Sequence, residues 1–377
     1  MPRLLSTHVP GLGIKSPYGI AFGFIEAHLK LIGWEVESLF TVDEITAIAK
    51  KGNKGRLEEI LKRADEFDPD LVFHREIDFS YMLGLLNPNI PQRNKTKYEI
   101  SFALYSRFHG RIEHAISSGE IGWDDEINTK DALLKVALKQ GWPIPNSRVL
   151  NEETIDLSSL AQELTGSKKG KIILKNPTQS GGINIFPITS EEDLEEALIS
   201  IKNPRGYLAQ ELIKPPKEIP YSIRIVSFGS EIIGAEIIFN PTKKYLSNAC
   251  QGGFGITLGL PGQPLSENGL LTIPTDHRTQ VIETLEHCGI DYKDRILPNR
   301  LLEVASKVAS FPANQLLRGS DYICPNQEPI LLEVNAGPGG PGQGMWASIT
   351  ETPKWNMGTE IGIAANLISL AIENLYQ

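Results

Sequence analysis

Short apolar runs separated by amphipathic stretches predict alternating strands and helices at the start of the chain. Residues 4–5 begin a first strand, residues 35–40 form a second, and residues 70–74 form a third that ends abruptly in polar side chains. Apolar residues recur with helical spacing between the first two strands, and a charged helical stretch covers residues 41–67. The pattern predicts a small open α/β domain over residues 1–127, in which ligands gather at the carboxyl ends of the strands.

A second unit is predicted from residue 128 onward, where helix signals become clear. Asn128 or Thr129 is suited to cap a helix that runs to Gln140, and Gly141 ends it. Strands and helices then alternate, which predicts a central subdomain over residues 128–213. Its expected elements are strands at residues 171–175 and 207–212 and a helix with an acidic first turn at residues 190–201.

The remaining residues, 214–377, are predicted to form a larger C-terminal subdomain. Two alternating runs flank Gly229 and Ser230, which predicts a β-hairpin with these residues in its turn. The other expected elements are a helix over residues 297–310, strands around Asp321 and Leu331, and a terminal helix that includes Ile372. Farther upstream, the pattern favours a helix over residues 98–117.

Composition narrows the classes of function. The chain has 377 residues and a net charge of −9 with scattered Lys and Arg, which argues against a nucleic-acid surface. Its three cysteines lie far apart without CxxC spacing, so neither a zinc site nor a disulfide framework is indicated. No apolar run suits a membrane helix, and the Pro-rich start lacks a signal-peptide apolar region. We expect a cytoplasmic protein without nucleic-acid or membrane partners, and we allow for a homodimer.

Three polar residues occupy strand positions where a core strand carries apolar ones. Glu333 and Asn335 lie two apart and therefore on one face of a strand, and a hairpin through residues 325–329 would bring Asp321 beside them. Two carboxylates and an amide oxygen are suited to one or two Mg²⁺ ions, with Mn²⁺ as an alternative. The structural alternative is a pair of surface strands with outward polar residues.

A lysine-terminated strand followed by a glycine turn is the second feature. Residues 171–175 deliver Lys175 to the end of a strand, and the next turn has little side-chain bulk, so its N–H groups could approach phosphate oxygens. The turn does not match the GxxxxGK[ST] pattern, which excludes that class of phosphate loop. A plain hairpin is the alternative for this segment.

The order of these motifs from about residue 128 to 339 resembles the ATP-grasp superfamily, nearest the branch of glutathione synthetases and ribosomal-protein glutamate ligases. The resemblance implies a fold class of α/β and α+β type, with an open pre-ATP-grasp domain followed by a two-subdomain ATP-grasp fold. It implies ATP and Mg²⁺ as cofactors, with the metal on Asp321, Glu333 and Asn335. The residues implied to contact the nucleotide are Lys130, Lys175, Ser180, Gly181, Gly182, Gln210, Glu211, Leu212, Ile213 and Glu218.

The same resemblance assigns catalysis to Lys175 and Arg224. Arg224 lies in Ser222-Ile-Arg224 where the family has Asp-x-Arg, so the usual ribose-binding acid is missing and Glu218 is its candidate replacement. Gln251 also replaces the family's usual Arg before two glycines. The alternative for Arg224 is a salt bridge between strands, and for Lys130 it is an exposed helix charge.

The predicted activity is an ATP-dependent ligase that joins a small-molecule carboxylate and an amine, on amino-acid or peptide substrates, through an acyl phosphate. Substrate contacts are expected from Arg75, Asn248, Gly337 and Gly339. A kinase that phosphorylates a hydroxyl, or a nucleotide-binding module without activity, are the competing readings. An amine requirement for ADP formation separates the ligase from the kinase.

Overall fold

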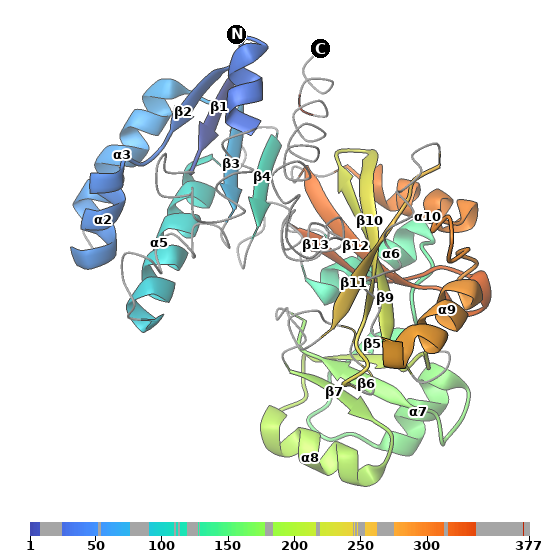
Figure 1. The fold of residues 1–377 in the computed structure, drawn as a ribbon. Coiled ribbons are helices and arrows are strands. Elements are labelled where there is room, and N and C mark those ends of the chain that lie inside the picture. The colour runs from blue at the N-terminus through green and yellow to red at the C-terminus, as the bar shows by residue number, and fades with distance from the viewer. Residues whose placement is uncertain are drawn as a thin grey trace.

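Among the residues that it describes, the computed structural model has three β-sheets with helices packed against them (Figure 1). It describes residues 1–7, 25–51, 54–75, 90–108, 111, 114–118, 127, 129–177, 184–215, 219–243, 245, 247, 253–261, 275–312, 316–336 and 372. Within these ranges, no helix is long and apolar enough to cross a membrane.

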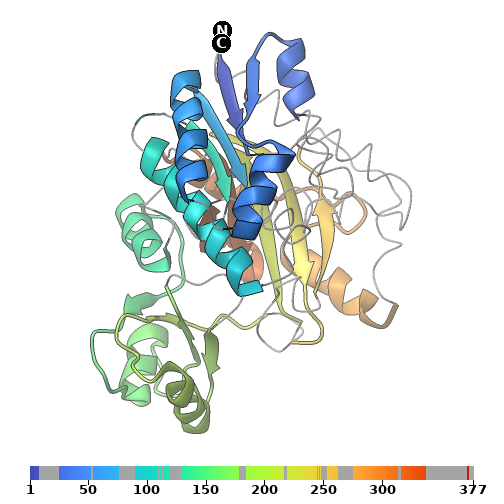
Figure 2. The ribbon, with the colours of Figure 1, turned by 90° about the vertical axis from the view of Figure 1, so that its left-hand side faces the viewer.

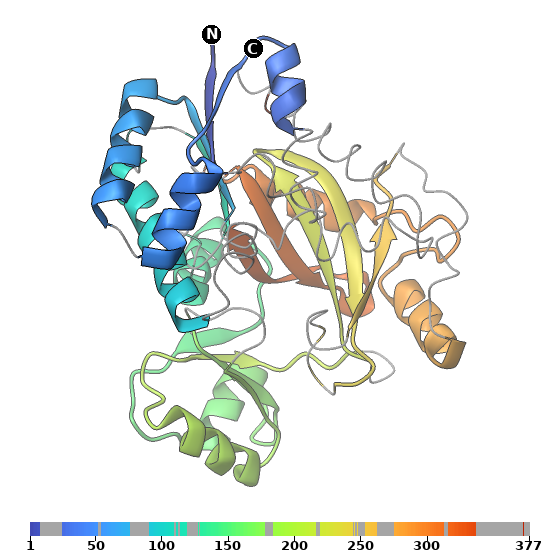
Figure 3. The same ribbon diagram turned by 60° about the vertical axis from the view of Figure 1, so that its left-hand side comes forward.

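The first sheet is parallel, with strand order β2-β1-β3-β4. Apolar side chains from α2, α3 and α5 form one core with Leu5 and Val72 of the strands, and Figures 1 and 3 show these three helices gathered on one side of the sheet. The strands are β1 (Arg3–Ser6), β2 (Glu35–Ser38), β3 (Leu71–Arg75) and β4 (His114–Ser118), and the helices are α2 (Val42–Lys51), α3 (Lys54–Phe67) and α5 (Ile90–Phe108). The predicted open α/β sheet is confirmed.

The helix predicted over residues 98–117 is wrong at both ends. Helix α5 begins at Ile90 and ends at Phe108, and residues 114–118 form β4, which pairs in parallel with β3. Pro91 is compatible with the early start because the first N–H groups of a helix have no intrahelical partner. The strand depends on its pairing with β3, which a local pattern of side chains does not reveal.

The second sheet is antiparallel, with order β5-β8-β6-β7, and forms a smaller body beside the rest of the chain (Figure 2). Ser190 caps its second helix by accepting the N–H of Asp193, and three acidic residues follow in the first turn, as the sequence predicts. The elements are β5 (Ser147–Val149), α7 (Leu157–Thr165), β6 (Ile172–Lys175), β7 (Ile185–Ile188), α8 (Glu191–Ile201) and β8 (Leu208–Glu211).

The third sheet is antiparallel and has five strands in the order β11-β10-β9-β12-β13. The predicted hairpin with Gly229 in its turn is confirmed as β9 and β10, and the predicted helix over residues 297–310 is confirmed as α10. The elements are β9 (Tyr221–Phe228), β10 (Glu231–Phe239), β11 (Phe254–Leu258), η5 (Thr275–His277), α9 (Arg278–His287), α10 (Asn299–Ala309), β12 (Leu317–Ile323), η6 (Pro325–Gln327) and β13 (Ile330–Ala336).

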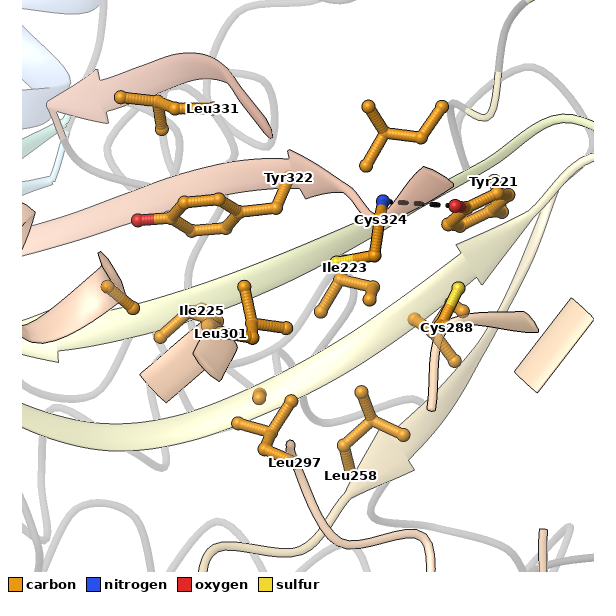
Figure 4. Packing of buried hydrophobic residues seen from close by; sticks show 14 of the residues in the cluster. Tyr221, Ile223, Ile225, Leu258, Cys288, Leu297, Leu301, Tyr322, Cys324 and Leu331 are labelled. Carbon is orange, nitrogen blue, oxygen red and sulfur yellow. Dashed lines mark hydrogen bonds between the residues drawn. The ribbon is translucent and has the colours of Figure 1, made fainter. Parts of the chain in front are cut away.

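One face of this third sheet covers a large apolar core. Ile223 and Ile225 of β9 point into it together with Leu301 of α10, and Tyr221 accepts the N–H of Cys324 at 3.0 Å at its edge (Figure 4). Because side chains alternate along a strand, Arg224 between the two isoleucines belongs to the other face. Because one face of the sheet is buried in this core, polar side chains such as that of Arg224 lie together on the opposite face.

Helix α6 (Lys130–Gln140) also packs into this apolar core, through Leu133 and Ala137. Thr129 caps the helix by accepting the N–H of Ala132, and Gly141 ends it with φ of 66°, in the left-handed region that glycine adopts readily. The packing places Lys130, at the first turn, beside the third sheet. With a parallel sheet followed by two antiparallel sheets and their helices, the predicted α/β and α+β class is confirmed.

Candidate functional site

A pocket lies between the second and third sheets, with an empty volume of about 830 Å³ that includes the part open to solvent. Residues 210–213, the end of β8 and the two residues that follow it, form part of its wall and are called the hinge segment below. The pocket is lined by Ile173, Lys175, Ile185, Gln210, Glu211, Leu212, Ile213, Pro215, Pro220, Tyr221, Ser222, Tyr245, Ser247, Asp321, Ile323, Leu332 and Glu333.

The three predicted metal ligands, Asp321, Glu333 and Asn335, lie together, and two of them, Asp321 and Glu333, line this pocket. We call these three residues the triple. Asp321 and Glu333 are directly paired across β12 and β13, with η6 in the connection, as the predicted hairpin requires. The Nδ2 atom of Asn335 donates to Asp321 Oδ2 at 3.2 Å and to Glu333 Oε1 at 3.3 Å. The three side chains therefore share one face and touch one another.

Arg224 joins the triple from the neighbouring strand β9. Its guanidinium donates through Nε and Nη2 to the two oxygens of Asp321, both at 2.7 Å. The strand register aligns Glu236, Arg224, Asp321 and Glu333 in a row across four strands. The salt bridge given as the alternative for Arg224 is thus observed, and it links the predicted catalytic arginine to a predicted metal ligand.

Two lysines from different elements, Lys130 of α6 and Lys175 of β6, act on the charge of Glu333. Lys130 Nζ lies 3.9 Å from Glu333 Oε2, and its side chain is only 12% exposed, so the alternative of an exposed helix charge is wrong. Burial raises the pKa of Glu333, but the charges of Lys130, Lys175 and Arg224 outweigh burial and hold that pKa below its usual value. Glu333 is therefore an anion surrounded by cations, matched to a site where further negative charge would be neutralised.

Lys175 is buried at the end of β6, and its partner is Gln210 of the hinge segment. Lys175 Nζ donates to Gln210 Oε1 at 2.6 Å, and Gln210 Nε2 donates to Ser147 Oγ at 2.9 Å. Burial lowers the pKa of Lys175 to about 8, with Lys130 acting in the same direction and Glu333 and Asp321 acting against it. Gln210 and Ser147 therefore fix the position of the lysine ammonium group.

Glu211 of the hinge segment is held by Asn146. Its carboxylate accepts the Asn146 backbone N–H at 3.2 Å and the Asn146 Nδ2 at 3.0 Å. The next N–H, of Leu212, donates to the Lys171 carbonyl at 2.9 Å. These bonds tie the hinge segment to the second sheet and fix the wall that it presents to the pocket.

A β-bulge in β13 brings an apolar residue to the pocket that strict alternation of side chains would place on the opposite face. Asp321 pairs with Glu333 and Tyr322 pairs with Leu331, so Leu332 is the extra residue of β13. Leu332 and Glu333 consequently both line the pocket although they are consecutive. Sequence reasoning also missed Ser147, which accepts from Gln210, and Glu236, which lies opposite Arg224 in the register of β9 and β10.

The first sheet contributes a buried polar cluster at the carboxyl end of β3. His74 contacts Thr7 Oγ1 through Nδ1 at 3.1 Å and Ser101 Oγ through Nε2 at 2.9 Å. Burial lowers the pKa of His74 to about 4, so the ring is neutral near pH 7. Arg75 follows as the last residue of β3, paired with Ser118 of β4, at the sheet edge where the sequence predicts substrate contacts.

Several predicted contacts lie outside the described residues. They fall in the predicted glycine turn, at the candidate ribose contact, between β10 and β11, and after β13. These residues are Ser180, Gly181, Gly182, Glu218, Asn248, Gly337 and Gly339.

The donor set of the triple fits a hard divalent cation. Two buried or half-buried carboxylates and one amide converge on a common point, and rotation of the Asn335 amide would present Oδ1 in place of Nδ2. Elsewhere in the described part of the chain, no group of three or more His, Cys, Asp or Glu side chains is placed to hold a metal ion. Oxygen donors of this kind suit a hard divalent cation such as Mg²⁺.

No protein-family model and no curated protein sequence matches the chain. Among solved structures, D-alanine–D-alanine ligase from Bacillus anthracis complexed with ATP is 11% identical, with full coverage of both chains and a TM-score of 0.46. Macrocyclase MdnC bound with precursor peptide MdnA, from Microcystis aeruginosa, is 18% identical, with 97% of this chain and 99% of that chain covered and a TM-score of 0.46. A Chryseobacterium gregarium RiPP-associated ATP-grasp ligase in complex with ADP and a leader and core peptide is 17% identical, with 98% and 96% covered and a TM-score of 0.48. Likeness at this level carries no functional weight, so a function has to come from the site itself.

Proposed function

We propose that this protein is an ATP-dependent ligase of the ATP-grasp type, which joins a carboxylate to an amine with release of ADP and phosphate. One observation supports it above the others: a single pocket between two sheets is lined by the hinge segment, Lys175 and the acidic residues Asp321 and Glu333. Such a pocket has an apolar part for a base, a cationic part for phosphates and an anionic part for a metal ion.

Different side chains of the pocket would contact the base, the phosphates and the metal ion. Ile173, Ile185 and Leu332 offer apolar surface near the hinge segment for the base. Lys130 and Lys175, whose charges both act on Glu333, would neutralise the phosphates. Asp321, Glu333 and Asn335 would hold Mg²⁺, which when bound supplies charge neutralisation of the phosphate oxygens.

The proposed chemistry runs in two balanced steps. A carboxylate oxygen of the substrate attacks the γ-phosphorus, the bond to the β-phosphate oxygen breaks, and ADP leaves. An amine nitrogen then attacks the acyl carbon, inorganic phosphate departs, and the nitrogen loses a proton to form the amide. Arg224 beside Asp321 is placed to stabilise charge during transfer, and no nucleophilic side chain is required.

A screen of carboxylates and amines tests the proposal directly. Amino acids and short peptides are supplied in pairs with ATP and Mg²⁺, ADP is quantified, and products are weighed by mass spectrometry. We expect ADP formation that needs both substrates and a product lighter than their sum by one water. A stable phosphorylated product formed without an amine would support a kinase, and nucleotide binding without any ADP would support a module without activity.

Nucleotide affinity should depend on pH through Lys175. Its pKa is lowered to about 8, so the ammonium charge is present at pH 7 and is lost as pH rises through 8. A bound phosphate stabilises the charged form, so binding above pH 8 should take up close to one proton, and affinity should fall by up to about tenfold per pH unit there. Besides burial, the charges that act on the pKa of Lys175 are those of Glu333 and Asp321, which raise it, and that of Lys130, which lowers it.

Calorimetry in two buffers of different ionisation enthalpy measures the proton uptake at pH 7 and pH 9. Lys175→Arg is the matched control, because a guanidinium stays protonated at both values and should remove the uptake at pH 9. Equal affinity and no proton uptake at pH 9 for the unaltered protein would show that Lys175 does not contact the nucleotide phosphates.

A further inference from the structure

A second pocket, separate from the triple, lies where the second sheet, the hinge segment and the hairpin of β12 and β13 meet. Its empty volume is about 900 Å³, the part open to solvent included. Pro325 and Ile330 come from the hairpin, and the other lining residues are Thr165, Lys169, Lys171, Glu211, Leu212, Ile213 and Lys214. We call it the hinge pocket.

The hinge pocket is basic in a protein whose net charge is −9. Among the described residues, three lysines, Lys169, Lys171 and Lys214, line it against a single carboxylate, that of Glu211. Both Glu211 oxygens are engaged by Asn146, at 3.2 and 3.0 Å. Within the described residues, none of the three ammonium groups has a hydrogen bond or an ion pair.

These lysines come from two places along the chain, the connection between α7 and β6 and the residue after the hinge segment. Lys169 lies in the turn after α7, Lys171 directly precedes β6, and Lys214 follows the hinge segment. Like charges that converge on one cavity repel one another, and an anion with several charged groups relieves that repulsion. Among the described lining residues, the one side-chain hydroxyl, that of Thr165, already donates to the Ala161 carbonyl at 2.8 Å, so recognition falls to the lysines.

We propose that the hinge pocket binds a small polyanion, a molecule that carries two or more phosphate or carboxylate groups. Such a ligand would contact the second sheet and the hairpin of the third sheet at once. Residues 211–213 line both pockets, so occupation of one would be linked in free energy to occupation of the other. The proposal rests on the charge and position of this pocket and does not require the ligase activity.

Pyrophosphate, without added metal, is the probe. Lysine acetylation followed by mass spectrometry locates the contact, because Lys169, Lys171 and Lys214 should react more slowly when pyrophosphate is present. Lys62, Lys139 and Lys168 are exposed lysines that do not line the pocket, and their reactivity should not change. Protection that is absent from all three pocket lysines would overturn the proposal, whether or not the nucleotide pocket also binds the probe.

Calorimetry with charge-matched variants gives the second readout. Lys169→Gln, Lys171→Gln and Lys214→Gln combined should weaken pyrophosphate binding by at least about tenfold, because charge-assisted contacts are lost. The control combines Lys62→Gln, Lys139→Gln and Lys168→Gln, which removes the same charge and should leave the affinity unchanged. Equal weakening in both variants would point to net charge alone and would contradict a built site. Thermal unfolding confirms that both variants fold.

Discussion

Glu333→Gln should reduce ADP formation by at least about 100-fold while leaving the fold intact. Glu333 is the carboxylate of the triple that Arg224 does not hold, and it faces Lys130 and Asn335. Glutamine keeps the size and the acceptor oxygen of the side chain but removes the charge that a divalent cation and the two lysines require. The loss should therefore appear in metal binding as well as in turnover.

Mn²⁺ titration followed by electron paramagnetic resonance measures the metal affinity without any knowledge of the substrates. Glu231→Gln is the matched control, since Glu231 is an exposed glutamate of the same sheet, and it should bind Mn²⁺ as the unaltered protein does. If Glu333→Gln bound Mn²⁺ normally and kept its activity, the metal assignment would be wrong even if the ligase reaction were right.

Arg224→Met should have opposite effects on metal binding and on turnover. Arg224 holds both oxygens of Asp321 at 2.7 Å, so a cation that binds Asp321 has to displace the guanidinium. In Arg224→Met, the affinity for Mn²⁺ in the absence of nucleotide should therefore rise about tenfold, a size typical of the coupling free energy between two ligands. Turnover should fall about 100-fold, because the positive charge beside the transferred phosphoryl group is lost.

The free energy of unfolding gives an independent measure of the competition between Arg224 and the metal ion for Asp321. Methionine fills similar space, but Asp321 would remain buried without its partner, which should cost about 3–5 kcal/mol of unfolding free energy. Saturating Mn²⁺ should restore more stability to Arg224→Met than to the unaltered protein. Arg278→Met, at an exposed arginine of α9, should change neither quantity. A variant whose Mn²⁺ affinity is unchanged or weaker would show that Arg224 and the metal do not compete for Asp321.

The local parts of the site are those that the sequence predicts well. Glu333 and Asn335 lie on one face because side chains alternate along a strand, and the short turn through residues 325–329 can only bring back a neighbouring antiparallel strand. The two ends of α6 likewise follow from the sequence, because Thr129 caps its start and Gly141 ends it. Each of these inferences depends on residues that are close together in the sequence, where backbone geometry limits the possible structures.

Contacts between distant segments follow a different rule. Arg224 meets Asp321 because β9 and β12 are adjacent in the sheet, although the two residues are 97 positions apart. Strand order and register depend on how whole apolar faces pack, so no local pattern specifies that pair. The pairing of Lys175 with Gln210, and that of β4 with β3 where a helix was predicted, arise in the same way.

The sequence by itself determined the residue types of the site, the strand face that carries Glu333 and Asn335, and the ends of the helix that begins at Lys130. The tertiary structure alone decided which cations surround those acids, because helix α6 packs on the third sheet while Lys175 comes from the second. It also decided the position of Leu332, since a bulge breaks the alternation on which the sequence argument depends. The physical reason is common to all of these: alternation and capping are local, whereas register and packing are properties of the assembled sheets.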